Sequence, residues 1–264
     1  MKSQKLLLNF LFIFIASICT QLKITGQVNE KKIDLDLVYI GNSITQGVQL
    51  EKSEIESPPA TASEYLSHKS QIRKIEFINQ GRSGFTTVDY LPSINGALKE
   101  VIVATRNLHR DSLKLLIISI SLGTNDSAEK GPNGSPVSAN EYRKNLKLIA
   151  NELLINFPEC KIIFQQPIWY SPNTYNRSKY MSEGLARLQT YFPELQSLVI
   201  EFALTNPGHV FIGDLTGFTY FRNNYLTDFI PESGNAGTFY LHPNKKGAIV
   251  LGKLWGDAIY KCLY

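Results

Sequence analysis

The stretch Asp36-Leu-Val-Tyr-Ile-Gly-Asn-Ser-Ile-Thr-Gln-Gly47 reads as a buried strand that runs into a tight polar turn. Residues 35–40 form a nearly unbroken apolar, partly β-branched run, which is typical of a parallel strand covered on both faces. Gly41 then allows a sharp turn. We therefore expect Ser43 at the carboxyl edge of a sheet, where a helix begins and main-chain N–H groups lack partners. That position suits a nucleophile, and it equally suits a serine that only caps the helix.

The rest of the chain repeats this pattern of an apolar run, a polar turn and a helix-like segment. We predict strands over residues 35–40, 72–79, 115–122, 161–166 and 209–212. The second run is less apolar, as an edge strand would be, and the third is the most hydrophobic and therefore central. Helices are predicted over residues 60–68, 94–108, 139–157, 179–190, 195–204 and 243–260, with a break at Pro193 and an irregular segment over 214–241. This alternation predicts an α/β fold with a parallel sheet between helices.

Length and composition predict one globular domain behind a targeting segment. The chain has 264 residues, of which 43% are apolar and 19% charged. Residues 1–5 carry two lysines, and residues 6–19 are apolar without a charge, so we assign residues 1–26 to a secretory signal peptide too short to span a bilayer. Residues 27–264 would then form a single secreted or periplasmic domain. Lipid anchoring at Cys19 is less expected, because Ile18 precedes it instead of a small residue.

The charges and cysteines exclude several classes of partner. The net charge of +4 is spread along the chain without a basic run, which argues against nucleic-acid binding and favours a small-molecule or glycan substrate. After removal of the signal peptide only Cys160 and Cys262 remain, and an exported protein allows a disulfide between them. No Cys/His pair has metal-ligand spacing, so we expect neither a metal nor another cofactor. The mature chain contains no predicted transmembrane segment, and the sequence does not indicate an oligomeric state.

Four polar turns carry the residue types that acyl transfer requires. Ser43, Gly84 and Asn125 follow the first three strands, and His242 precedes the last helix. A hydroxyl becomes a good nucleophile when a base removes its proton, so Ser43 would attack and His242 would act as base and then as acid. The tetrahedral oxyanion needs fixed donors. The N–H groups of Ser43 and Gly84 and the side-chain amide of Asn125 would supply them.

The same turns resemble the four sequence blocks of the SGNH/GDSL hydrolase superfamily. The matching segments are, in order, Gly41-Asn-Ser-Ile, Asn79-Gln-Gly-Arg-Ser-Gly84, Gly123-Thr-Asn-Asp126 and His242-Pro-Asn244. Each block is weak alone, but four in this order at strand ends are specific, and they extend along nearly the whole mature chain. The resemblance implies a three-layer α/β/α, flavodoxin-like fold and metal-free esterase or acylhydrolase chemistry, with Gly84 as the oxyanion glycine.

Two positions depart from the family pattern. The first block usually has Asp before the serine, where this chain has Asn42. The acid that normally lies three residues before the histidine is also missing, because Phe239 occupies that position. A carboxylate there would hold the imidazole tautomer and stabilise its cation. Three alternatives follow, in order of preference: a Ser/His dyad completed by a carbonyl or water, a replacement acid from Asp228 or Glu232, and a weakened or inactive enzyme.

The aromatic residues near the active edge raise the question of the substrate. Trp169, Tyr170 and Tyr240 could stack on sugar rings or pack a loop onto the sheet, and with Asn42 they are our candidates for substrate binding. We expect a serine esterase that removes a short acyl group, most simply acetyl, from a carbohydrate. This preference rests on the resemblance and on the lack of a long apolar stretch outside the core. The alternatives are a lipase, lysophospholipase or thioesterase of the same fold, and an inactive carbohydrate-binding homologue.

Overall fold

Five parallel strands form the centre of the protein in a computed structural model that describes residues 32–94 and 96–263. Their order is β2-β1-β3-β4-β5, which leaves β2 at an edge and β3 in the middle, as the hydrophobicity of the runs predicted. The strands are β1 (Ile33–Gly41), β2 (Ile72–Gly81), β3 (Leu115–Ser121), β4 (Lys161–Phe164) and β5 (Val210–Ile212). The predicted signal segment lies outside the described residues.

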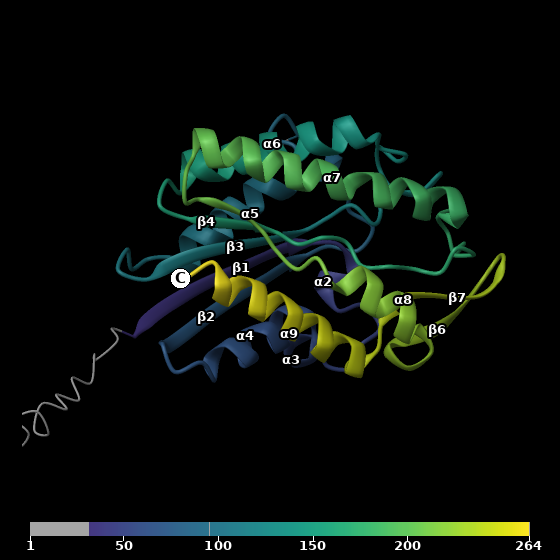
Figure 1. Ribbon diagram of the computed structural model, residues 1–264, viewed down its shortest axis with the longest axis horizontal. Helices are drawn as coiled ribbons and strands as arrows, with labels where there is room; N and C mark the ends of the chain where they lie inside the picture. Colours follow the sequence, from purple (N-terminus) through teal and green to yellow (C-terminus); the bar gives the residue numbers. More distant parts are fainter. Residues whose placement is uncertain (1–31, 95, 264) are drawn as a thin grey trace, which may run out of the picture. The chain divides into compact units, whose positions relative to one another are not determined.

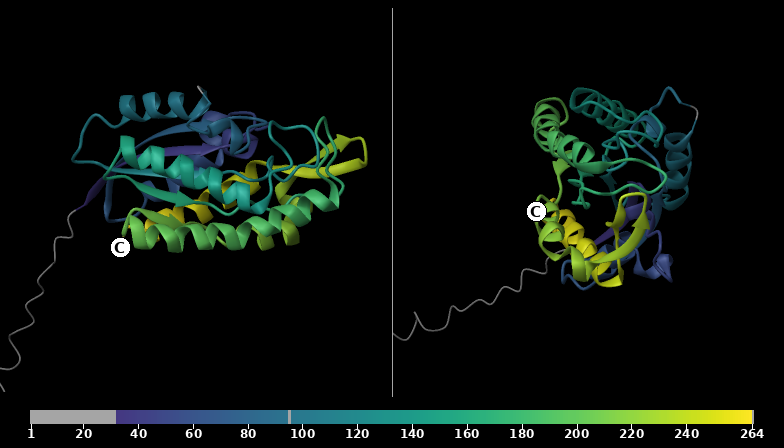
Figure 2. Two further views of the ribbon diagram at one scale, coloured as in Figure 1. Left: turned by 90° about the horizontal axis from the view of Figure 1, so that it is seen from above. Right: turned by 90° about the vertical axis from the view of Figure 1, so that its right-hand side faces the viewer.

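Helices cover both faces of this sheet, so the three-layer α/β/α prediction is confirmed (Figure 1). One face carries α4 (Pro58–Ser67) and α9 (Lys245–Lys261), and the other carries α5 (Ala97–Leu108), α6 (Ala139–Asn156) and α7 (Met181–Thr205) (Figure 2). The remaining short helices are α2 (Ser43–Gln46), α3 (Ser53–Glu56), η1 (Val88–Tyr90) and α8 (Gly217–Asp228). Among the described residues, no helix is both long and apolar enough to cross a bilayer.

The register of the sheet brings three strand ends to one line. Gly41 pairs with Gly81 on β2 and with Ser121 on β3, so β1, β2 and β3 finish side by side. Polar turns follow each end. Tyr90 joins the ends of β1 and β2, because its one hydroxyl hydrogen lies between the main-chain oxygens of Gly41 and Gln80, which are 3.0 and 3.1 Å from the hydroxyl oxygen. The topology therefore places the predicted serine, glycine and asparagine turns at the same edge.

Two segments differ from the sequence prediction. Helix α7 continues through Pro193, where a break was predicted. Proline removes one helical hydrogen bond, but buried Tyr191 and Leu195 flank it, and their packing holds the helix together across the defect. The segment predicted to be irregular instead forms α8 and an antiparallel hairpin of β6 (Phe229–Gly234) and β7 (Gly237–Pro243). The pairing is irregular between Phe229 and Pro231, which is where a strand tolerates proline.

The two cysteines of the domain are free thiols, so the disulfide that an exported protein would allow is absent. Cys160 is buried, and the Cys262 thiol donates to the main-chain oxygen of Ala258 at 3.2 Å. Burial raises the pKa of the Cys160 thiol to about 12, which keeps it protonated and unreactive.

Substitution of Gly41 tests the tight junction between β1 and α2. A Cβ atom at this position would lie 2.0 Å from Thr45 Oγ1 and 2.8 Å from the main-chain oxygen of Ser121. We predict that Gly41→Ala lowers the free energy of unfolding by about 1–3 kcal/mol in urea denaturation. Adding Thr45→Ala should recover only a small part of the loss, because it removes the contact with Oγ1, which has no hydrogen-bond partner among the described residues, but keeps the Thr45 Cβ at 2.6 Å. Equal unfolding midpoints for Gly41→Ala and wild type would contradict this.

Candidate active site

A chain of short polar contacts links a serine, a histidine and a glutamate. His242 Nε2 lies 2.9 Å from Ser43 Oγ, and His242 Nδ1 lies 2.9 Å from Glu232 Oε1. A carboxylate only accepts hydrogen bonds, so Nδ1 must carry the imidazole hydrogen. Nε2 then has a free lone pair, which accepts the hydroxyl hydrogen of Ser43. This is the arrangement in which a histidine can withdraw a proton from an alcohol.

Local structure holds Ser43 at the start of α2. The side chain of Asn42 caps this helix by accepting a hydrogen bond from the Ile44 N–H at 3.0 Å. Ser43 is then the first helical residue, and its own N–H has no partner among the described residues. The sequence allowed Ser43 to be either the helix cap or a nucleophile. In the structure Asn42 caps the helix, and the Ser43 hydroxyl contacts His242.

His242 lies near the end of β7, directly before α9. Asn244 caps α9 by accepting from the Gly247 N–H at 3.0 Å, and its amide donates to the main-chain oxygen of Thr227 at 2.8 Å. The His-Pro-Asn block therefore has a structural explanation. Its asparagine fixes the strand-to-helix junction that carries the imidazole.

The acid comes from the strand paired with β7. Glu232 on β6 is the cross-strand neighbour of Phe239, the residue three positions before His242 where the family usually has an acid. The carboxylate therefore reaches the imidazole from the adjacent strand, while Phe239 is buried. This contact corresponds to the second alternative from the sequence, a replacement acid, and not to the dyad that the sequence favoured. Asp228 is not the replacement, because its buried carboxylate binds Tyr220 and Lys246 instead.

The predicted oxyanion donors gather beside Ser43. Gly84 has φ = +81°, a conformation that favours glycine, and its N–H has no partner among the described residues. The Asn125 amide donates one hydrogen to the main-chain oxygen of Phe85 at 2.9 Å, while its oxygen accepts from the Tyr180 hydroxyl at 2.7 Å. These two contacts fix the amide orientation and leave its second N–H available.

These groups line one open cavity of about 670 Å³. Ser43, Gly84, Asn125, Glu232 and His242 are all on its wall. The rest of the lining is mostly polar and consists of Val48, Gln49, Ser83, Pro132, Asn176, Arg177, Ser178, Tyr180 and Leu241. The structure thus brings the four sequence-predicted residues and one carboxylate together in a single site.

The sequence profile of the GDSL-like lipase/acylhydrolase family matches residues 39–248, which span the serine, the histidine and every turn between them. This chain belongs to that family. Membership of this family makes the protein a carboxylic ester hydrolase. Among curated proteins, none matches the sequence.

Solved structures of esterases share the fold of this hydrolase. A variant of an acetyl-xylooligosaccharide esterase from Geobacillus is 18% identical with a TM-score of 0.60, and the match covers 87% of this chain and 96% of that one. A carbohydrate acetylesterase from Sinorhizobium meliloti is 17% identical with a TM-score of 0.55, covering 87% and 99%. An aryl esterase from M. smegmatis is 14% identical with a TM-score of 0.57, covering 86% and 99%. At these identities the similarity shows the fold alone.

The four residues predicted to bind substrate do not line the hydrolase cavity. Asn42 is buried and occupied in capping α2. Trp169 is buried against Tyr225, with ring centroids 5.3 Å apart. Tyr170 is fully buried, and its hydroxyl oxygen lies 2.9 Å from Ser127 Oγ. Tyr240 is half-buried and packs edge-on against the ring of Tyr225. The side chains of these residues are thus engaged in contacts within the fold, and their role in substrate binding stays a prediction.

Three cavity residues of the hydrolase escaped the sequence analysis. Tyr180 orients the Asn125 amide, Gln49 donates to Glu232, and Arg177 lies on the cavity wall. None belongs to a recognisable block, and the contacts of Gln49 and Tyr180 span 183 and 55 residues. No local pattern in the sequence could have indicated them.

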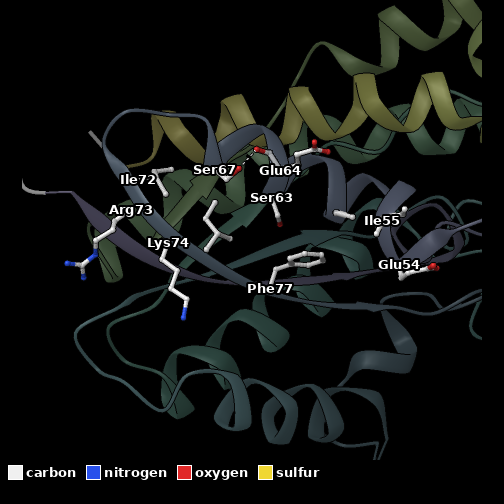
Figure 3. Close-up of a pocket in the computed structure, with 11 residues that line it drawn as sticks. Glu54, Ile55, Ser63, Glu64, Ser67, Ile72, Arg73, Lys74 and Phe77 are labelled. Atoms are coloured by element: carbon white, nitrogen blue, oxygen red, sulfur yellow. Dashed lines mark hydrogen bonds between the residues drawn. The ribbon is translucent and has the colours of Figure 1, made fainter.

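A second hollow, of about 340 Å³, lies where α4 passes the edge strand β2 (Figure 3). Its lining, which includes Glu64, Arg73 and Phe77, shares no residue with the Ser43 cavity and contains no histidine among the described residues. Across residues 32–94 and 96–263, no group of three His, Cys, Asp or Glu side chains is arranged to hold a metal ion. The contacts between Ser43, His242 and Glu232 lie in the larger of these two cavities.

A buried carboxylate links the turn of Asn125 to the segment that follows Gly84. Asp126 Oδ1 accepts hydrogen bonds from the main-chain N–H of Thr87, at 2.9 Å, and from its hydroxyl. This contact ties the turn that contains Asn125 to the segment after Gly84. Asp126 Oδ2 has no partner among the described residues, and burial raises the pKa of this carboxyl to about 6.

Asp126 therefore gives the stability of the hydrolase a distinct pH dependence. Its folded pKa lies above the unfolded value of 3.8, so the folded state holds this proton more tightly. The resulting stability is complete below pH 3.8 and is lost as the pH rises through about 6. In urea denaturation from pH 4 to pH 8, wild type should lose up to about 3 kcal/mol relative to Asp126→Asn. A wild-type-to-variant difference that does not change with pH would contradict the assignment.

Proposed function

We propose that this hydrolase is a serine esterase that removes a short acyl group, most simply acetyl, from a carbohydrate. The observation that carries the proposal is the unbroken contact chain from Ser43 Oγ through His242 to Glu232, with both heavy-atom distances at 2.9 Å. The signal-like composition of residues 1–26 further supports an exported enzyme.

Acylation begins when Ser43 Oγ attacks the ester carbonyl carbon and His242 Nε2 takes the hydroxyl proton. Glu232 stabilises the imidazolium that forms, because its carboxylate lies against Nδ1. When the tetrahedral intermediate collapses, the bond to the sugar oxygen breaks and His242 returns the proton to that oxygen. The alcohol leaves, and the acyl group stays on Ser43 as an ester.

Deacylation repeats the same proton transfers with water. His242 removes a proton from a water molecule, whose oxygen attacks the acyl carbon. Collapse of the second intermediate releases the carboxylic acid and returns the proton to Ser43 Oγ. In both steps the N–H groups of Ser43 and Gly84 and the free amide hydrogen of Asn125 bind the oxyanion. Loss of one such donor typically lowers the rate by about 10²–10³-fold.

The wall of the cavity supports a short acyl group and a polar alcohol. Its aliphatic side chains are Val48, Pro132 and Leu241. Three such side chains match a short acyl group better than a long chain. Most other lining groups are hydroxyls, amides and charges, which match the hydrogen-bonding surface of a sugar.

Chain-length selectivity tests the proposed reaction. Purified enzyme should hydrolyse p-nitrophenyl acetate with at least tenfold higher kcat/KM than p-nitrophenyl dodecanoate, and Ser43→Ala should lower the acetate rate by about 10⁴-fold or more. Preference for the dodecanoate would favour a lipase, lysophospholipase or thioesterase. Glycan binding without turnover would favour an inactive binding protein, and either result would end the proposal.

Removal of the carboxylate tests the role of Glu232 separately. We predict that Glu232→Gln lowers kcat by about 10²–10⁴-fold, because a neutral amide stabilises the imidazolium less and can select the wrong tautomer. The matched control is Glu64→Gln, an exposed position on α4 outside the cavity, which should leave kcat within twofold. Equal activity of the two variants would show that Glu232 has no catalytic role and would favour a Ser43/His242 dyad.

A further inference from the structure

Gln49 joins the serine side of the active site to the hairpin that supplies the acid. It follows α2 by a few residues, and its Nε2 lies 2.5 Å from Glu232 Oε2 on β6. The same nitrogen lies 3.3 Å from His242 Nδ1. Because Nδ1 already donates its hydrogen to Glu232, this second contact brings two donors together and is not a hydrogen bond. Both donors instead converge on one carboxylate.

The backbone of Gln49 is strained. Its φ angle is +71°, in the left-handed region that non-glycine residues rarely adopt. The side chain is exposed, so burial of apolar surface does not offset the strain. Strained conformations of this kind persist where the surrounding structure requires them, and they gather at functional sites. From this conformation the side chain of Gln49 forms its hydrogen bond to Glu232.

Gln49 completes the set of donors around the carboxylate. Glu232 Oε1 accepts from the His242 side chain and, at 3.2 Å, from the His242 main-chain N–H, while Oε2 accepts from Gln49. The Glu232 side chain is 11% exposed and lines the open cavity. Without a hydrogen bond to Oε2, the carboxylate could rotate toward the solvent in that cavity. A donor on each oxygen fixes both the position and the plane of the acid.

We propose that Gln49 is a positioning residue that locks the hairpin acid against His242. This inference rests on the proposed function, because it assigns Gln49 to the orientation of Glu232. The same role accounts for the positive φ angle in the turn after α2. The segment that carries Ser43 also positions Glu232 through Gln49. A cross-strand acid needs this support, because it projects from a two-stranded hairpin and not from the main sheet.

Two substitutions separate this role from a purely structural one. Gly and Asn both tolerate a positive φ angle, so Gln49→Gly and Gln49→Asn remove the strain without disturbing the turn. Asn keeps the amide but is one methylene too short to reach Glu232. We expect kcat for p-nitrophenyl acetate to fall about 10–100-fold in both variants, with melting temperatures that drop by no more than a few degrees.

A double-mutant cycle with Glu232→Gln provides the deciding readout. If Gln49 acts through Glu232, Gln49→Gly should cost less than about threefold in the Glu232→Gln background. An equal loss in both backgrounds, or full activity of the single variants, would overturn the inference while the esterase proposal stands. If Glu232→Gln itself keeps full activity, the assigned role of Glu232 fails and this inference fails with it.

An independent observation concerns the charge of the substrate. Arg177 is an exposed residue on the wall of the Ser43 cavity, and it forms no hydrogen bond or ion pair with the described residues. Two hydrogen bonds fix the main chain beside it. Asn235 Nδ2 donates to the main-chain oxygen of Asn176 at 2.9 Å, and the Ser178 N–H donates to Asn176 Oδ1 at 2.8 Å. Glu232, the one carboxylate of the cavity lining, is already bound to His242.

We infer that Arg177 binds a carboxylate on the alcohol part of the substrate, as in an acylated uronic acid residue. A guanidinium presents a planar pair of N–H donors that matches a carboxylate. This inference rests on the proposed function and narrows its substrate class from carbohydrate esters to acidic ones.

The test compares acetate release from two matched sugars, O-acetylated methyl glucuronide as the free acid and as its neutral carboxamide. For wild type at low salt, kcat/KM should favour the acid, and Arg177→Gln should lower the acid-to-carboxamide ratio about tenfold. The matched control is Lys130→Gln, an exposed cation that does not line the cavity, which should change the ratio less than twofold. Equal ratios for wild type and Arg177→Gln would overturn the inference and leave the esterase intact. If neither sugar is hydrolysed, this inference is overturned. If p-nitrophenyl acetate is not hydrolysed either, the esterase proposal is overturned as well.

Discussion

The contact between the His242 imidazole and the Glu232 carboxylate is the interaction on which the proposed chemistry of this site depends. It fixes the hydrogen on Nδ1, leaves Nε2 free for Ser43 and provides a counter-charge for the imidazolium. Its unusual feature is its origin. Glu232 and His242 lie on the two paired strands of a hairpin, whereas the family pattern has the acid and the histidine on one segment, three residues apart. A carboxylate can thus move to a paired strand and keep its contact, since facing side chains on adjacent strands are close in space.

The sheet makes the second contribution to the site, because it brings distant turns to one edge. Aligned ends of β1, β2 and β3 place Ser43, Gly84 and Asn125 beside one another. Interactions below the surface then stiffen these turns. Tyr90 joins the ends of β1 and β2, and the buried Asp126 carboxylate joins the segment after Gly84 to the turn of Asn125. Donors held in this way need little reorganisation when an oxyanion forms.

The sequence predicted what local patterns encode. Apolar runs indicated five strands and their edge and centre, and residue types at strand ends indicated the serine, glycine, asparagine and histidine. It failed where pairing between distant segments decides the structure. Pro231, Gly234 and Gly237 are atypical of strands, so the sequence does not predict the hairpin that brings Glu232 opposite Phe239. Trp169 and Tyr170 follow β4, and this position suggested a sugar-binding surface. Both side chains are instead buried within the fold. Gln49 and Arg177 belong to no motif, and only coordinates reveal their place in the cavity.

Nitrogen-15 NMR of the imidazole of His242 tests the central claim most directly. In protein labelled at histidine, with the signal assigned by its loss in His242→Gln, we predict that at pH 8 the hydrogen resides on Nδ1 and gives a proton resonance shifted far downfield by the carboxylate. Glu232→Gln should move that resonance upfield. A hydrogen found on Nε2, or a resonance that Glu232→Gln leaves unchanged, would contradict the pairing of His242 with Glu232.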